Sequence, residues 1–116
     1  MKRLSLALFL ALLAGAAHAQ ALTGRQIYGK AVYDGTCAFC HGPRGFATTL
    51  LKRRVGEANS LLAERTNLTA AYIKLAVRHG VMSMPWYRRS ELSDDDLAAI
   101  TDYLTRSNPN RGSAAK

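Results

Sequence analysis

Apolar residues recur along much of the chain at intervals of three and four residues, which is the spacing of a helix face. This pattern predicts three helices, over residues 23–33, 69–80 and 93–107. Thr23, Thr69 and Ser93 are suited to cap the N-termini of these helices, and Gly80 is suited to end the second one. We therefore expect an all-α fold.

Two segments lack this spacing. Residues 42–66 contain several glycines, a proline and the basic run Lys52-Arg53-Arg54, and we expect a loop there with one short helix. Residues 108–116 are polar with no apolar periodicity, which predicts a disordered tail.

The first 19 residues have the composition of a secretory signal peptide. Two basic residues precede an apolar run over residues 4–14, and small residues lead to a cleavage position between Ala19 and Gln20. The apolar run is shorter than the roughly 20 residues that a membrane span requires. Ala16 stands where a lipoprotein signal would carry its lipid-bearing cysteine. We therefore predict cleavage, export to the periplasm and no stable membrane anchor.

Removal of the signal peptide leaves 97 of the 116 residues, enough for one domain, which we place at residues 20–107. This length excludes a Rossmann domain or a TIM barrel. The full chain has 16 Lys and Arg against 8 Asp and Glu, and loss of Lys2 and Arg3 lowers its net charge from +8 to +6. Such a charge favours a redox partner with an acidic docking face. Because export separates the chain from nucleic acid, we expect no nucleic-acid partner.

The chemistry of the chain is indicated by the run Cys37-Ala38-Phe39-Cys40-His41. A Cys-x-x-Cys-His motif is typical of covalent c-type haem attachment, in which both thiols add to porphyrin vinyl groups and the histidine ligates iron. A thioredoxin-like dithiol site would require a preceding strand, and zinc would require further ligands, whereas His79 is the one other histidine of the mature chain. The motif therefore predicts one haem c, held by Cys37 and Cys40, with His41 as the proximal ligand.

The second axial ligand of the iron decides the function. A methionine opposite the histidine gives an electron-transfer centre of raised potential, whereas an open position gives oxygen or ligand chemistry. We favour Met84, because Pro85 holds an extended loop beside it. Met82 is interpreted as a packing residue. His79 could give a site with two histidine ligands, but we interpret it as a cap of the preceding helix or a surface residue. The prediction is therefore electron transfer without catalysis, and the alternative is a peroxidase-like protein or gas sensor with an open sixth site.

Over about residues 22–107, the sequence resembles class I c-type cytochromes. The resemblance rests on Gly29-x-x-x-Tyr33-x-x-x-Cys37, the haem motif, Arg78-x-Gly80-x-x-x-Met84-Pro85 and Leu97-x-x-Ile100-x-x-Tyr103-Leu104. It implies the small cytochrome c fold, in which the N- and C-terminal helices cross over a covalently bound haem. We expect Gly29 at that crossing, against Ile100 and Tyr103, because a missing Cβ lets a facing element approach closely.

Residues 70–87 are similar to the cytochrome subunits of flavocytochromes of the p-cresol methylhydroxylase type. This similarity implies that the chain accepts single electrons from a flavoprotein dehydrogenase subunit that oxidises phenolic compounds. The alternative is a free diffusible shuttle to a terminal oxidase. Two interpretations stay open for Trp86 and Tyr87: either they shield the haem or bond a haem propionate, or they are ordinary packing residues. The basic residues are likewise open: they either pair a propionate or surround the haem edge for docking, or they are solvated charges; these residues are Arg88, Arg89 and Lys52-Arg53-Arg54.

Overall fold

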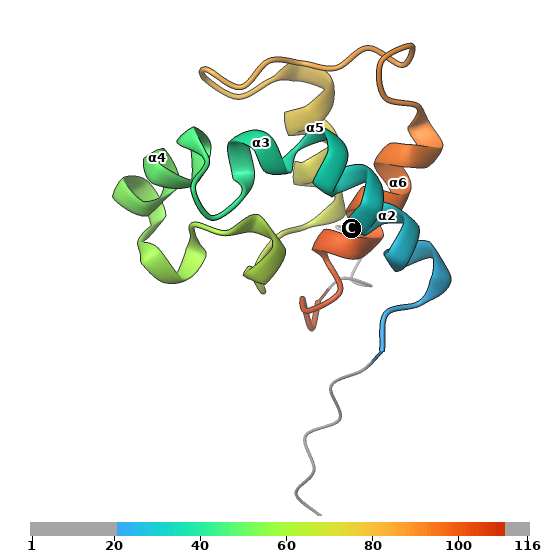
Figure 1. The fold of residues 1–116 in the computed structure, drawn as a ribbon, viewed down its shortest axis with the longest axis horizontal. Helices are drawn as coiled ribbons and strands as arrows, with labels where there is room; N and C mark the ends of the chain where they lie inside the picture. The colour runs from blue at the N-terminus through green and yellow to red at the C-terminus, as the bar shows by residue number, and fades with distance from the viewer. Residues whose placement is uncertain (1–20, 111–116) are drawn as a thin grey trace, which may run out of the picture.

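The computed structural model describes residues 21–110, and within this range the regular structure is helical apart from one isolated antiparallel bridge between Val81 and Met84. In chain order the elements are α2 (Gly24–Thr36), α3 (Ala38–His41), α4 (Phe46–Val55), the 3-10 helices η1 (Glu57–Asn59) and η2 (Leu62–Glu64), α5 (Ala70–His79) and α6 (Asp94–Leu104) (Figure 1). The all-α prediction is confirmed for these residues. The predicted signal peptide and residues 111–116 of the predicted tail lie outside the described residues.

The three predicted helices form, and each begins at its predicted cap. The side chains of Thr23, Thr69 and Ser93 accept hydrogen bonds from backbone N–H groups in the first turns of α2, α5 and α6. Such caps satisfy donors that have no partner inside the helix. The first helix runs three residues further than predicted, to Thr36, and the last ends three residues earlier, at Leu104.

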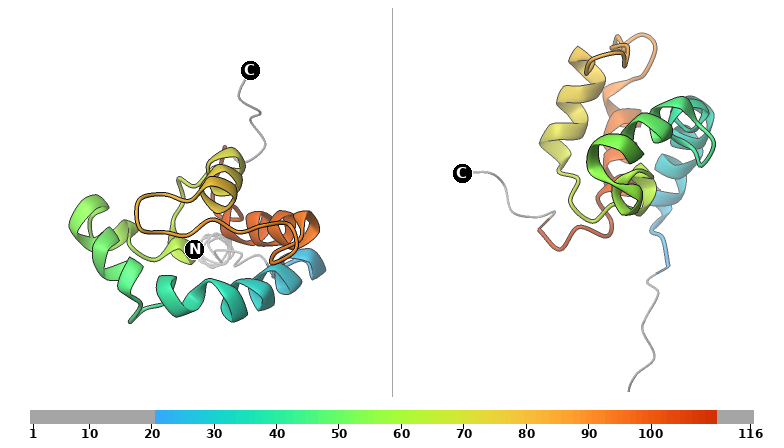
Figure 2. Two further views of the ribbon diagram at one scale, coloured as in Figure 1. Left: turned by 90° about the horizontal axis from the view of Figure 1, so that it is seen from above. Right: turned by 90° about the vertical axis from the view of Figure 1, so that its left-hand side faces the viewer.

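Helices α2 and α6 pack side by side (Figures 1 and 2). Gly29 of α2 lies directly against the backbone of α6. A Cβ atom built on Gly29 would lie 1.9 Å from the carbonyl oxygen of Ala99 and 3.0 Å from the backbone nitrogen of Ile100. The predicted crossing of the terminal helices is thus present. Gly29 contacts the backbone of Ala99 and Ile100, whereas Tyr103 packs with Tyr33 at a ring-centroid distance of 5.8 Å.

The hydrophobic core lies between α2, α5 and α6. Its buried members include Tyr33 from α2, Ile73 and Val77 from α5, and Leu97 and Ile100 from α6. Leu68 and Leu92, from the segments before α5 and α6, also belong to it. The core thus joins α2, which leads into the Cys37 to His41 turn, to α5, which leads into the loop that carries Met84.

The segment predicted as a loop with one short helix contains the ten-residue α4, followed by the short turns η1 and η2. Beyond α6, Asn108 is buried and its side-chain amide donates a 2.6 Å hydrogen bond to the carbonyl of Leu68. The disordered tail was predicted to begin at residue 108, but this residue is an ordered part of the fold. None of the helices within residues 21–110 combines the length and the apolar character needed to span a membrane.

Candidate functional site

A cavity of about 250 Å³ lies beside the core, with a mostly apolar lining. Residues of α3 and α4 line this cavity together with residues of α5 and of the loop that follows it. Cys37, Cys40, His41 and Met84 all line this cavity. The fold therefore brings together the four residues that were predicted from two distant segments of the sequence.

The two cysteines and His41 are held on one helical turn at the end of α2. Cys37 caps α2, and its carbonyl accepts backbone hydrogen bonds from Cys40 at 3.1 Å and from His41 at 2.9 Å. Tyr33 also donates from its hydroxyl to the carbonyl of His41 at 3.3 Å. Both cysteines are free thiols, with Cys37 partly buried and Cys40 exposed.

The environment of this turn favours neutral side chains. Burial and the neighbouring charge of Cys40 raise the pKa of Cys37 to about 11. Burial also lowers the pKa of His41, which favours the neutral imidazole that can ligate a metal. Two free thiols and a neutral imidazole on the wall of an apolar cavity fit the donor set that a covalent haem requires.

The Nδ1 atom of His41 is buried and has no hydrogen-bond partner among the described residues. An acceptor for this nitrogen, such as a backbone carbonyl near Pro43, would fix the imidazole tautomer. The neighbouring carbonyl of Gly42 instead accepts from the Thr48 hydroxyl at 2.8 Å and from the Gly45 N–H at 2.9 Å. That carbonyl is therefore already occupied in this structure.

Met84 reaches the cavity from a loop whose path depends on Gly80. Gly80 adopts φ 74°, a conformation that favours glycine, and a Cβ there would lie 2.7 Å from the Met84 carbonyl oxygen. The Met84 N–H donates to the Val81 carbonyl at 2.9 Å, and the Tyr87 N–H returns the chain to Val77 of α5 at 2.8 Å. The loop thus folds back against α5 and leaves Met84 partly buried against the core.

The other two ligand candidates are placed differently. Met82 also borders the cavity, but its side chain is 73% exposed and its sulfur contacts the guanidinium of Arg54. The interpretation of Met82 as an apolar packing residue was therefore wrong. His79 lies exposed in the last turn of α5, as expected for a capping residue, and does not line the cavity.

Two arginines line the cavity, and the sequence pattern indicated only one of them. Arg54 belongs to the basic run at the end of α4, where its neighbour Lys52 instead pairs with Glu57. Arg65 reaches the cavity from the segment after η2, and its isolated position in the sequence offered no signal. The cavity therefore has basic groups on its wall in addition to the predicted ligands.

Pro85 lines the cavity beside Met84, and the chain leaves the cavity wall after it. Trp86 and Tyr87 do not line the cavity, and Tyr87 packs against the core. The Arg88 guanidinium lies 5.1 Å from the centroid of the Trp86 ring, and Arg89 pairs with Asp94 at 2.7 Å. Among residues 21–110, no group of three or more His, Cys, Asp and Glu side chains is arranged to hold a metal ion.

Comparisons with known proteins agree on one family. Residues 19–104 match the family model described as cytochrome c oxidase, cbb3-type, subunit III. The chain is 32% identical over 77 residues to the cytochrome c subunit of 4-cresol dehydrogenase (hydroxylating) from Pseudomonas putida, covering 66% of this chain and 58% of that protein. It is 33% identical over 89 residues to cytochrome c6 from Cladophora glomerata, covering 66% of this chain and 81% of that one. No solved structure matches the chain significantly.

Proposed function

Because the chain belongs to this family of class I c-type cytochromes, which carry covalently bound haem c, we propose that it transfers single electrons through a haem ligated by His41 and Met84. The observation that supports this assignment is the shared cavity, which Cys37, Cys40, His41 and Met84 line together. When bound, the haem supplies an iron that gains and loses one electron, at a potential raised by a histidine and methionine pair.

Each of the four residues would have a separate role in binding the haem. Cys37 and Cys40 would hold the macrocycle through thioether bonds, and the neutral imidazole of His41 would supply the proximal nitrogen. A thioether is a weak ligand, so Met84 depends on the loop that positions it, and Gly80 and the Tyr87-to-Val77 hydrogen bond restrain that loop. The mostly apolar lining excludes water and so limits the reorganisation that accompanies electron transfer.

Arg54 and Arg65 would pair with the two haem propionates. They are the lysine or arginine side chains that reach the cavity wall within the described residues, and a carboxylate in an apolar site requires a cationic partner. Planar guanidinium groups suit carboxylates because they can donate two parallel hydrogen bonds.

Spectra of the ferric and ferrous protein test the assignment of Met84. Met84→Ala should abolish the far-red sulfur-to-iron band of the ferric protein and allow the ferrous protein to bind carbon monoxide at once. Met82→Ala is the matched control on the same loop and should change neither property. Immediate carbon monoxide binding by the unaltered protein would instead support the open sixth site of a sensor or peroxidase-like protein.

We further propose that the electron donor is a flavoprotein dehydrogenase that oxidises phenolic compounds. The similarity to the cytochrome subunit of 4-cresol dehydrogenase supports this assignment, although the chain spans only 58% of that relative's length. The excess of basic residues favours an acidic docking face on the partner. Affinity purification of the tagged chain from its native host should recover a flavin-containing subunit in a fixed ratio. Recovery of the chain alone would favour the free diffusible shuttle.

Export to the periplasm belongs to the same proposal. Its support is the signal-peptide composition of residues 1–19. The N-terminal sequence of the haem-loaded protein from a periplasmic extract should begin at Gln20. A haem-loaded chain that retains Met1 in a membrane fraction would contradict cleavage.

A further inference from the structure

The segment that carries Met84 is joined to α5 by one backbone hydrogen bond, from the Tyr87 N–H to the Val77 carbonyl. Residues 81–92 connect α5 to α6 without forming a helix, and many of their side chains are exposed. Such segments open locally at low free-energy cost unless other parts of the fold hold them. The proposed ligand therefore lies on a part of the chain that requires an anchor.

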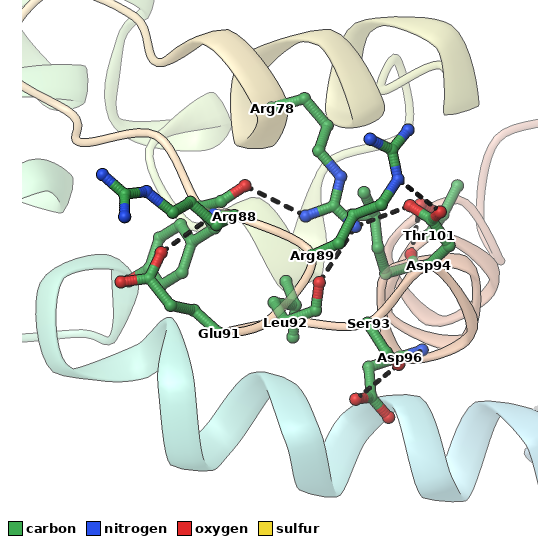
Figure 3. Close-up of polar contacts among 11 residues, drawn as sticks. Arg78, Arg88, Arg89, Glu91, Leu92, Ser93, Asp94, Asp96 and Thr101 are labelled. Atoms are coloured by element: carbon green, nitrogen blue, oxygen red, sulfur yellow. Dashed lines mark hydrogen bonds and ion pairs between the residues drawn. The ribbon is translucent and has the colours of Figure 1, made fainter.

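Arg78, in the last turn of α5, contacts this segment at two points. Its Nη1 donates to the carbonyl of Tyr87 at 3.0 Å, and its Nη2 donates to the carbonyl of Leu92 at 3.0 Å (Figure 3). Nη2 also donates to the Asp94 carboxylate at 2.7 Å, in the first turn of α6. One side chain thus joins α5, both ends of the 87–92 stretch and the start of α6.

The burial of Arg78 distinguishes it from the arginines nearby. Its side chain is 14% exposed, whereas that of Arg89, which pairs with the same carboxylate, is 75% exposed. The Arg78 Nε is buried without a hydrogen-bond partner among the described residues, so the two terminal nitrogens make all the contacts. Hydrogen bonds from Arg89 and Arg78 hold the pKa of Asp94 below its usual range, so the carboxylate stays charged.

We propose that Arg78 is a positioning residue that fixes the 81–92 segment and thereby holds the Met84 sulfur at the iron. This inference rests on the ligation by Met84 proposed above. Buried hydrogen bonds to a charged group contribute more than neutral ones, and a guanidinium can donate to several acceptors in fixed directions. Lysine keeps the charge but has one nitrogen, which cannot reproduce the two-pronged contact.

The experiment uses the haem-loaded protein and the variants Arg78→Met, Arg78→Lys and Arg89→Met. Hydrogen exchange of peptides within residues 81–92 measures the anchoring, and the far-red band and the reduction potential measure the sulfur ligand. In Arg78→Met, the backbone amides of this segment should exchange about 10 to 100 times faster, while exchange in α2 stays unchanged. The same variant should lose most of the far-red band. Arg89→Met removes the same charge from the same carboxylate and should change exchange less than threefold.

Arg78→Lys is used in its place if Arg78→Met does not retain haem. It should also weaken the far-red band and speed hydrogen exchange within residues 81–92. Unchanged exchange in both Arg78 variants would overturn the proposal. Faster exchange with an unchanged band and potential would overturn it too, because Arg78 would then stabilise the segment without positioning the ligand. The spectrum of the unaltered protein tests ligation by Met84 without any variant. Absence of the far-red band from that spectrum would refute ligation by Met84, and with it the positioning role of Arg78.

Discussion

The close approach of Gly29 in α2 to the backbone of α6 makes a quantitative prediction. In Gly29→Ala, the added Cβ would lie 1.9 Å from the Ala99 carbonyl oxygen, whereas ordinary contacts begin near 3.4 Å. The helices would therefore have to separate by about 1.5 Å. The opposing atoms belong to backbone, so no side-chain rotation can relieve the clash.

The expected cost follows from two opposing effects. Overpacking a buried contact costs about 1 to 3 kcal/mol, and a clash with backbone belongs at the upper end. Alanine in place of glycine inside a helix returns about 1 kcal/mol. The free energy of unfolding should therefore fall by about 2 kcal/mol, equivalent to a decrease of roughly 8 to 16 °C in Tm.

The measurement is urea unfolding of the haem-loaded protein, followed by far-ultraviolet circular dichroism. The matched control is Gly35→Ala in the same helix, because a Cβ at Gly35 meets no atom within 4 Å. This control should be as stable as the unaltered protein or more stable by up to about 1 kcal/mol. Unfolding of Gly29→Ala at the same urea concentration as Gly35→Ala would show that this contact does not limit the approach of the two helices.

Three further predictions concern charge. Arg54→Gln should lower the reduction potential by on the order of 40 mV, or about 1 kcal/mol for one electron, because loss of a nearby cation favours the ferric state. The measurement is voltammetry, and the control is Arg53→Gln, which lies one residue away and not on the cavity wall. The pKa of Asp94 is lowered by hydrogen bonds from Arg89 and Arg78, so its contribution to stability should be complete above the ordinary pKa of about 3.9 and be lost as pH falls through the lower folded value. Urea midpoints between pH 2 and 5 should show this loss, and Asp94→Asn should reduce it; an identical pH dependence in the variant contradicts the assignment. Electron transfer to an acidic redox protein, measured by stopped flow, should slow as ionic strength rises, because the Debye length falls from about 30 to 8 Å. A constant rate would exclude electrostatic steering by the basic surface.

Local features of the sequence predicted the helices and the haem motif well. Thr23, Thr69 and Ser93 accept from backbone N–H groups three residues away, so their capping roles can be inferred from the sequence alone. The Cys37 to His41 turn is equally local, because its geometry is set within five residues. These elements required no knowledge of the tertiary fold.

Features that depend on tertiary contacts were predicted less well. In helix α4, Phe46 is exposed and lines the cavity. The apolar residues of this helix therefore do not form a buried face that the sequence pattern could reveal. Arg65 reaches the cavity, and Arg78 reaches residues 9 to 16 positions away, only because the chain folds back. Met82 lies on an exposed turn with φ 55°, which no apolar pattern could indicate.

A redox titration of the purified protein, followed in both the visible haem bands and the far-red band, is the decisive test of electron transfer through the His41 and Met84 pair. We expect one reversible step in which the ratio of reduced to oxidised protein changes tenfold per 59 mV. The far-red band should disappear in the same step, because it belongs to the ferric iron bound by the Met84 sulfur. A titration with no reversible one-electron step, or with a haem that shows no far-red band when oxidised, would contradict electron transfer through a His41 and Met84 pair.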